Sequence, residues 1–129
     1  MTTCVVDTHA LVWFLAEDPR LTARAKSALD SALSDGLLIV PSIVLAEMMY
    51  IAEKGRVPIP FKEVVRRLEP NKRIDIAPLD LETLKIASEI RANLEIHDRV
   101  IVATAIFYNA RLITKDEAIE RSRLVSVVW

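Results

Sequence analysis

The chain alternates between short apolar runs and longer amphipathic stretches. Runs rich in Val, Ile and Leu predict buried strands, whereas apolar residues spaced three and four positions apart predict helices. The predicted strands are residues 2–7, 37–40, 73–78, 111–114 and 124–128. The predicted helices are residues 8–17, 22–36, 42–55, a shorter segment between Pro60 and Pro70, 80–94, 97–110 and 115–122.

This order of elements predicts an α/β fold. Strands that alternate with helices form βαβ units, in which a mainly parallel sheet is covered on both faces. Thr22 and Asp80 stand where helix N-caps are expected, and the segment 73–78 has the pattern of an edge strand. Right-handed crossovers place the carboxyl ends of the strands on one edge, which is where such sheets bind ligands.

Composition narrows the class of protein. The 129 residues are 52% apolar and predict one domain, residues 1–129, with a sizeable core. Cys4 is the single cysteine and sits in the first apolar run, so we expect a small core residue in a reducing compartment. The start lacks the pattern of a secretory signal, and the longest uncharged run, residues 100–110, is too short to span a bilayer. We therefore expect a soluble, cytoplasmic protein.

The charge is balanced overall but uneven along the chain. The net charge is −1, yet the segment from Lys54 to Arg73 carries seven Lys or Arg against two Glu, which is +5 and leaves −6 elsewhere. A basic strip of this kind permits contact with a polyanion such as RNA. The alternative is a solvated helix face with no partner.

Four carboxylates from distant segments are predicted to meet at the carboxyl edge of the sheet. Asp7 ends the first strand, Asp116 follows the strand at 111–114, and Asp98 begins the helix before that strand. Each of these three also stands where an N-cap is wanted, so capping alone is an alternative role for each. Glu47 lies on an apolar helix stripe, where its alternative role is a buried salt bridge with Arg99 or Arg111.

Clustered carboxylates point to a divalent cation. Like charges repel, and one of the group would take up a proton unless a cation were present. Mg²⁺ and Mn²⁺ prefer carboxylate oxygen ligands, and no Cys or His spacing in the chain supports zinc. Such ions activate water and stabilise the charge of a reacting phosphate, so a phosphodiester is the expected substrate class.

Four stretches resemble the motifs of PIN-domain nucleases, in particular the VapC-like toxins of bacterial and archaeal toxin–antitoxin pairs. The stretches are VVDTHALVW, PSIVLAEMMY, HDRVIVATA and RLITKDEAI. They stand in the family's order and spacing, with 40 residues from Asp7 to Glu47, 51 more to Asp98 and 18 more to Asp116. The resemblance implies a PIN-like three-layer α/β/α fold with a mainly parallel five-stranded sheet.

The resemblance also implies a Mg²⁺- or Mn²⁺-dependent endoribonuclease that acts as the toxin of a type II pair. Asp7, Glu47, Asp98 and Asp116 match the acidic metal site of the family. Thr114 matches a hydroxyl residue beside that site, which helps to position metal-bound water; its alternative is an ordinary strand-end threonine. Lys115 stands at a variable position of the family and is expected to face solvent.

The family further implies an RNA substrate, a cognate antitoxin that blocks the acidic edge, and a homodimer. Arg66, Arg67 and Arg99 are the candidate RNA contacts. Trp13 and Met49 are candidates for antitoxin contact, because aromatic residues and methionine are enriched at interfaces. The alternative role of each is that of a core residue. Truncation of a residue that faces a partner should weaken the complex without unfolding the protein, whereas unfolding would show that the residue belongs to the core.

Two other functions remain as alternatives. A phospho-acceptor receiver module is also a parallel α/β domain with acids at one edge, but it needs two adjacent acids after the first strand, and here Thr8 follows Asp7. The second alternative is a catalytically silent PIN-like domain that binds RNA or protein. All four acids are present, so no feature of the sequence favours it.

Overall fold

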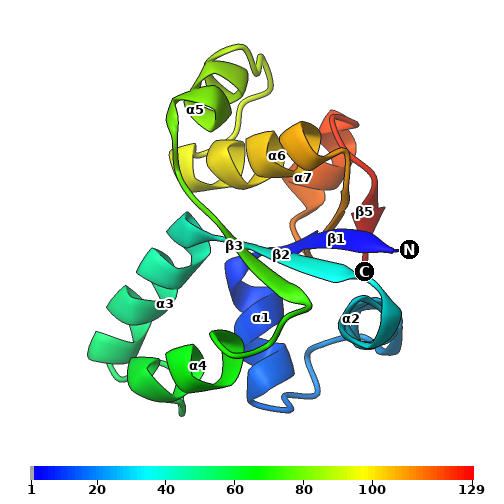
Figure 1. Ribbon diagram of the computed structural model, residues 1–129. Coiled ribbons are helices and arrows are strands. Elements are labelled where there is room, and N and C mark those ends of the chain that lie inside the picture. The colour runs from blue at the N-terminus through cyan, green and yellow to red at the C-terminus, as the bar shows by residue number, and fades with distance from the viewer. Residues whose placement is uncertain (1) are drawn as a thin grey trace.

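A computed structural model describes residues 2–129 and contains, within them, five strands and seven helices (Figure 1). The strands are β1 (Thr3–Val6), β2 (Leu37–Pro41), β3 (Ile74–Ala77), β4 (Arg111–Ile113) and β5 (Val127–Val128). The helices are α1 (Thr8–Leu15), α2 (Ala23–Asp35), α3 (Ser42–Glu53), α4 (Phe61–Leu68), α5 (Leu81–Ser88), α6 (Ile96–Tyr108) and α7 (Glu117–Ser122). Each predicted element is present, and the predicted caps Thr22 and Asp80 accept hydrogen bonds from backbone N–H groups.

The strands form one sheet in the order β3-β2-β1-β4-β5, and each neighbouring pair is parallel. Helices α1 to α4 cover one face and α5 to α7 cover the other (Figure 1). The predicted three-layer α/β/α fold is therefore confirmed, and the sheet is wholly parallel through the described strands. The receiver alternative is wrong, because that fold has the strand order 2-1-3-4-5.

The strand order creates a switch point between β1 and β4. The chain first builds β1, β2 and β3 outward, and α5 and α6 then carry it back to β4 on the other side of β1. Crossovers that diverge from two neighbouring strands leave a crevice outside the carboxyl ends of those strands. Val6 lies opposite Ile113 in this pair, and the Asp7 N–H donates to the Ile113 carbonyl at 3.1 Å. Asp7 and Thr114 therefore enter the crevice side by side.

The central strands are buried on both faces, as strands between two helical layers must be. Cys4, Val5 and Val6 of β1 are completely buried, and burial raises the pKa of the Cys4 thiol. The edge position predicted for the segment 73–78 is confirmed by β3. Among residues 2–129, none of the helices combines the length and the apolar character needed to cross a membrane.

The region between α5 and α6 differs from the prediction. The segment 80–94 was expected to be one helix, but α5 ends at Ser88 and a loop follows. Ile90 and Leu94 in this loop pack against the core, so their helical spacing reflects burial by a loop. The Arg99 Nη2 group of α6 donates to the Ala87 carbonyl at the end of α5 at 2.8 Å, and this carbonyl also accepts the Ile90 N–H at 3.2 Å.

A substitution at Gly36 tests the junction between α2 and β2. A Cβ at Gly36 would stand 2.0 Å from the Thr2 carbonyl oxygen and 3.1 Å from the Ala32 Cα. Both are backbone atoms, so β1 or α2 must shift. We expect Gly36→Ala to lower the free energy of unfolding by about 2–3 kcal/mol, measured by urea denaturation.

Gly55→Ala is the matched control. Gly55 has φ +67°, but a Cβ there would meet no atom within 4 Å. Only the left-handed backbone is strained, so we expect a loss of about 1 kcal/mol. A loss for Gly36→Ala no larger than that for Gly55→Ala would contradict the close approach of Thr2.

Candidate active site

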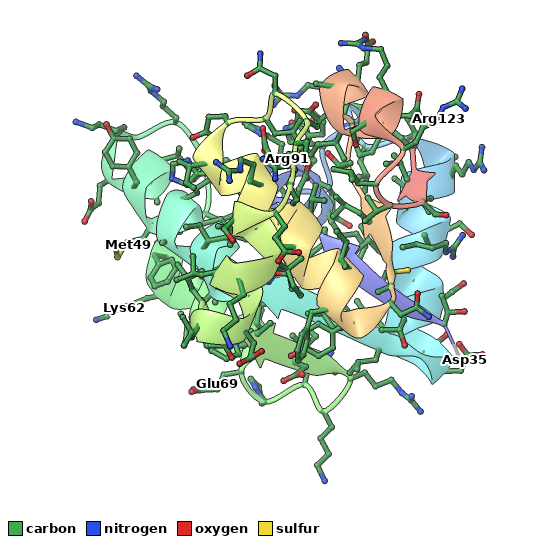
Figure 2. All side chains as sticks on the ribbon, turned by 90° about the horizontal axis from the view of Figure 1, so that it is seen from above. Asp35, Met49, Lys62, Glu69, Arg91 and Arg123 are labelled. Carbon is green, nitrogen blue, oxygen red and sulfur yellow. The ribbon has the colours of Figure 1, made fainter. Side chains whose placement is uncertain are left out.

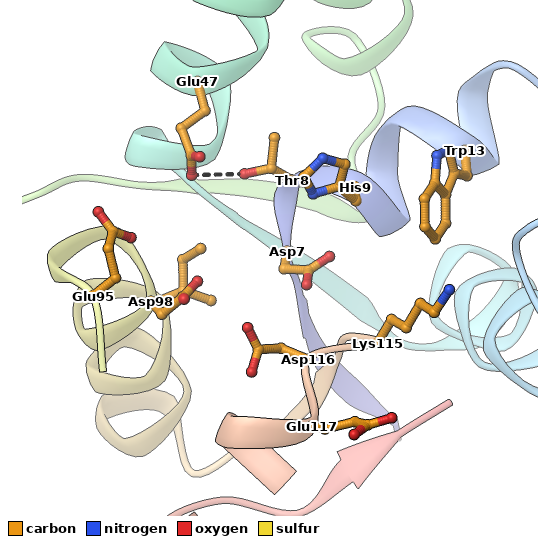
Figure 3. A pocket seen from close by; sticks show the side chains of 11 residues that line it. Asp7, Thr8, His9, Trp13, Glu47, Glu95, Asp98, Lys115, Asp116 and Glu117 are labelled. Atoms are coloured by element: carbon orange, nitrogen blue, oxygen red, sulfur yellow. Dashed lines mark hydrogen bonds between the residues drawn. The ribbon is translucent and has the colours of Figure 1, made fainter. Parts of the chain in front are cut away.

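A cleft of about 610 Å³ opens over the carboxyl ends of β1 and β4 (Figure 3). Its lining includes all four predicted acids, and each comes from a different element. Asp7 follows β1, Glu47 lies in the second turn of α3, Asp98 lies in the first turn of α6, and Asp116 precedes α7. Successive acids that are 18 to 51 positions apart along the chain thus share one cavity, as the sequence predicted.

Asp7 is held by both carboxylate oxygens. Oδ1 accepts the Ala10 N–H at 2.9 Å and so caps α1, and Oδ2 accepts a short hydrogen bond from the Thr114 hydroxyl. Each carboxylate oxygen has two lone pairs, so acceptor capacity remains after these bonds. The capping role of Asp7 is therefore confirmed and does not compete with a role in the cleft.

Thr114 is the completely buried link beneath the acids. Its hydroxyl donates to Asp7 and accepts the Asp116 N–H at 3.1 Å. Asp116 in turn caps α7, because its Oδ1 accepts the Ile119 N–H at 2.9 Å. One side chain therefore sets the relative position of two carboxylates.

Glu47 is held by Thr8, a residue that the sequence analysis missed. The Thr8 hydroxyl donates to Glu47 Oε1 at 2.8 Å, and the Thr8 side chain is buried (Figure 3). The salt-bridge alternative for Glu47 is wrong, since no cation of residues 2–129 pairs with it. The signal in the sequence was a hydroxyl at the first position of an otherwise apolar helix.

Asp98 does not cap α6, contrary to one alternative. Glu95 is the N-cap, with its side chain accepting the His97 N–H at 3.1 Å, and Asp98 is the third residue of the helix, within its first turn. Glu95 also contacts the His97 ring, with 2.5 Å between Oε1 and Nδ1, and this hydrogen bond raises the pKa of His97. Asp98 is therefore free of a capping role and points into the cleft (Figure 3).

The acids raise one another's pKa. Burial, together with repulsion from Asp116, Glu95, Glu47 and Asp7, raises the pKa of Asp98 to about 6. Burial also raises the pKa of Asp7 against the opposing effect of its hydrogen bonds. The cleft thus gathers negative charge, and among residues 2–129 none of its four acids forms an ion pair with a Lys, Arg or His side chain.

The donor set fits a hard divalent cation in its chemistry. The four converging side chains offer carboxylate oxygens, which Mg²⁺ and Mn²⁺ prefer, and a cation would relieve the repulsion that raises the pKa of Asp98. Within residues 2–129, however, no three Asp, Glu, His or Cys side chains stand close enough together to hold one ion as they are placed.

The three arginines predicted to contact RNA lie outside the cleft lining. Arg66 pairs with Glu63 on the exposed face of α4, and Arg67 donates to the Leu15 carbonyl at 3.0 Å. Arg99 reaches the end of α5, where its Nε is buried without a partner. Their contact with RNA stays a prediction. Lys115, which was expected to face solvent, is exposed but lines the cleft.

The two residues predicted to contact an antitoxin differ in exposure. Trp13 is only 8% exposed and belongs to the core, which was its alternative role, so its truncation is expected to disturb the fold. Met49 is 44% exposed and projects outward from α3 (Figure 2). Met49 is therefore the better placed of the two for contact with a partner.

The raised pKa of Asp98 predicts a pH-dependent cost in stability. Because its pKa is about 6 in the folded chain against the ordinary 3.8, the folded state binds the proton more tightly between these values. Stability therefore falls as pH rises through this window. We expect Asp98→Asn to raise the free energy of unfolding of the metal-free protein by about 1–2 kcal/mol at neutral pH, allowing for solvent screening, and to give no gain below pH 3.8.

Urea denaturation across this pH range measures the effect. Asp30→Asn makes the same charge change on exposed α2, where Asp30 pairs with Lys26 at 3.0 Å, and should change stability by less than about 0.5 kcal/mol. An equal gain for Asp98→Asn at neutral and at acidic pH would contradict the charge repulsion.

Comparisons with known proteins agree with this geometry. The chain matches the model of the PIN domain over residues 4–123. It is 32% identical over 126 residues to Ribonuclease VapC22 of Mycobacterium tuberculosis, with 95% of this chain and 94% of that protein covered.

Solved structures show the same fold at lower identity. VapBC2 from Rickettsia felis, bound to a DNA fragment from their promoter, has a TM-score of 0.72 at 19% identity, covering 98% of this chain and 97% of that one. DNA-bound VapBC from Salmonella typhimurium has a TM-score of 0.72 at 18% identity, with the same coverage of 98% and 97%. From its sequence, its fold and the acids of its cleft, this chain belongs to the PIN-domain family.

Proposed function

We propose that this protein is a Mg²⁺- or Mn²⁺-dependent endoribonuclease and the toxin of a type II toxin–antitoxin pair. The observation that carries the proposal is the convergence of Asp7, Glu47, Asp98 and Asp116 at the switch point of the sheet. Nucleases of this family depend on metal ions, and the similarity to a ribonuclease over nearly the whole chain supports RNA as the substrate. The all-carboxylate donor set favours Mg²⁺ or Mn²⁺ over softer metals.

The four acids would hold the cation, and hydrogen bonds from two threonines orient two of these acids. A bound divalent cation supplies a nucleophilic water at neutral pH and neutralises charge on the scissile phosphate. Thr114 fixes the orientation of Asp7, and Thr8 fixes that of Glu47. Because these carboxylates are oriented before substrate arrives, less side-chain freedom is lost on binding.

The proposal includes a cognate antitoxin and a homodimer. Support for an antitoxin comes from the similarity of the fold to VapBC proteins. Exposed apolar residues on two helices support the presence of surfaces that an antitoxin or a second copy of the chain would cover. These residues are Met49 and Tyr50 on α3, and Leu81 and Leu84 on α5.

Cleavage of RNA by the purified, antitoxin-free protein tests the proposal. A synthetic single-stranded RNA pool is incubated with Mg²⁺ or Mn²⁺, and with EDTA in place of metal. We expect cutting only with metal, and a loss of about a hundredfold or more in Asp7→Asn. Asn caps a helix as well as Asp does, so this variant should keep α1 intact.

Asp80→Asn is the matched control. Asp80 caps α5 by accepting the Thr83 N–H at 3.0 Å, and it lies outside the cleft lining. We expect it to cut RNA at the wild-type rate. A folded wild-type protein that binds Mn²⁺ in calorimetry but cuts no RNA would contradict the ribonuclease and favour the silent binding domain.

Thr114 is predicted to position the acids. Thr114→Val keeps the shape of a completely buried side chain but leaves Asp7 without a donor and the Asp116 N–H without an acceptor. We expect about a tenfold to hundredfold loss of cleavage and weaker Mn²⁺ binding by calorimetry. Thr114→Ser retains the hydroxyl and should recover both. Equal cleavage by the Val and Ser variants would show that the Thr114 hydroxyl does not position the acids and that Thr114 is an ordinary strand-end residue.

A further inference from the structure

A second cavity of about 210 Å³ lies beside the acidic cleft, and we call it the Trp13 pocket. It lies between α1, the end of α3 and the loops that follow these helices. The residues that matter below are His9, Trp13, Ala16, Arg20, Ile51 and Arg56. His9 and Trp13 also line the cleft, so the two cavities share a wall. The chemistry proposed above makes no use of this pocket.

Unpaired positive charge gathers at this end of the cleft. Lys115 lines the cleft and Arg56 lines the pocket, and neither has an ion pair among residues 2–129. Two of the acids nearby are paired, Asp18 with Arg20 at 2.8 Å and Glu117 with Arg121 at 3.5 Å. Figure 3 shows Trp13 and Lys115 at the end of the cleft away from Glu95 and Asp98. A polyanion that reaches the cleft is therefore attracted from the Trp13 side.

Trp13, in the wall between the cavities, is surrounded by two cations and two tilted aromatic rings. The Arg20 guanidinium lies 4.9 Å from the Trp13 ring centroid, and the Lys115 ammonium lies 5.7 Å from it. The rings of His9 and Trp129 each lie 5.8 Å from the Trp13 ring. Arg20 is further fixed by Asp18, which accepts its backbone N–H and two guanidinium N–H groups at 2.8 to 3.0 Å. The Arg20 guanidinium is thus held in place before any ligand binds.

Arg56 is placed by the end of α3. Gly55 adopts φ +67°, its N–H donates to Ala52 at 3.0 Å, and the Arg56 N–H donates to Ile51 at 3.0 Å. These bonds close the helix in a Schellman arrangement, which the left-handed glycine permits. The same turn therefore orients Arg56 and presents Ile51 to the pocket.

The pocket combines apolar walls with a planar cation. Val12, Ile51, Val57 and Pro58 supply apolar surface, and the Arg20 guanidinium offers a flat charged one. Unpaired RNA bases are recognised by stacking on arginine planes and by contact with apolar surface. The volume of about 210 Å³, against about 610 Å³ for the cleft, suits one small planar group and is too small for a helix.

We propose that the Trp13 pocket binds one nucleobase of the RNA substrate, that of a nucleotide flanking the scissile phosphate, while Arg56 and Lys115 contact the adjoining phosphates. This inference rests on the proposed ribonuclease activity. It assigns base preference at the cut site to the pocket and leaves the bond-breaking step to the acids.

Two variants test it by different means. Ala16 lies in the pocket with right-handed helical backbone angles, φ −87° and ψ −2°, so Ala16→Leu fills the pocket without changing charge. Arg56→Ala removes the phosphate contact and leaves the pocket open. Ala23→Leu and Arg24→Ala make the same changes on the exposed start of α2 and serve as matched controls.

Each protein is given Mn²⁺ and a single-stranded RNA pool with randomised positions, and the cut ends are sequenced. We expect the wild type to prefer particular bases at one flanking position, and Ala16→Leu to reduce that preference about tenfold. An abasic nucleotide at that position should slow the wild type by a similar factor and leave Ala16→Leu unaffected. Arg56→Ala should slow cleavage and weaken its salt dependence. Both controls should match the wild type.

The outcomes separate this inference from the proposed function. Cutting by the wild type with no base preference beside the cut, or a preference that Ala16→Leu retains, overturns the base pocket and leaves the ribonuclease standing. If Ala16→Leu retains the base preference but no longer binds the antitoxin, the base pocket is overturned and the pocket is a protein contact instead. Absence of metal-dependent cutting by the wild type overturns the proposed function, and this inference with it.

Discussion

The hydrogen bond from the Thr114 hydroxyl to the Asp7 carboxylate joins two segments whose negative charges repel each other. The same hydroxyl accepts the Asp116 N–H at 3.1 Å, so the ends of β1 and β4 are tied together just below the acids. Thr114 is completely buried and no water competes for its hydroxyl, which makes these bonds costly to break. They exist because Val6 pairs with Ile113, and a shift of one residue would turn Thr114 away.

The carboxylates of Asp7 and Asp116 serve the fold and the cleft together. Each accepts a backbone N–H of the helix that follows it, and the amino end of a helix carries partial positive charge that favours an anion. This stabilises a carboxylate beside other acids without using all its lone pairs. Capping and cation binding, treated in the sequence as competing roles, are compatible at both residues. Asp98 and Glu47 do not cap a helix, and burial together with repulsion from the neighbouring acids raises the pKa of Asp98 to about 6.

Charge is distributed unequally along the cleft. Glu95, Asp98 and Glu47 crowd one end, while Lys115 stands at the other beside Trp13 and the pocket that holds Arg20 and Arg56. The basic strip seen in the sequence contributes Arg56 to this end. Arg66 and Arg67 instead pair with Glu63 and with the end of α1. The fold therefore separates the basic residues of this strip. Arg66 and Arg67 make contacts within the protein, whereas Arg56 lines the pocket.

Much of the fold was readable because it depends on local patterns. Buried parallel strands need apolar runs and helices need apolar residues at helical spacing, so the elements and their order followed from the sequence. The end of α5 did not, because Ile90 and Leu94 meet the core from a loop with the same spacing that a helix would give. Thr8 was missed for a related reason: its hydrogen bond to Glu47 spans 39 residues, and no local pattern reports it.

By itself the sequence determined the α/β class, the four acids and the edge of the sheet where they meet, because strand ends and helix starts are local and parallel crossovers bring them to one side. Only the tertiary structure decided how those acids are held, which cations stand near them and where a second cavity opens. Hydrogen bonds between distant segments and the direction of each long side chain depend on packing of the whole chain. Arg99 is an example. Its guanidinium donates to a carbonyl at the end of α5, and the Glu47 carboxylate accepts its hydrogen bond from Thr8 instead.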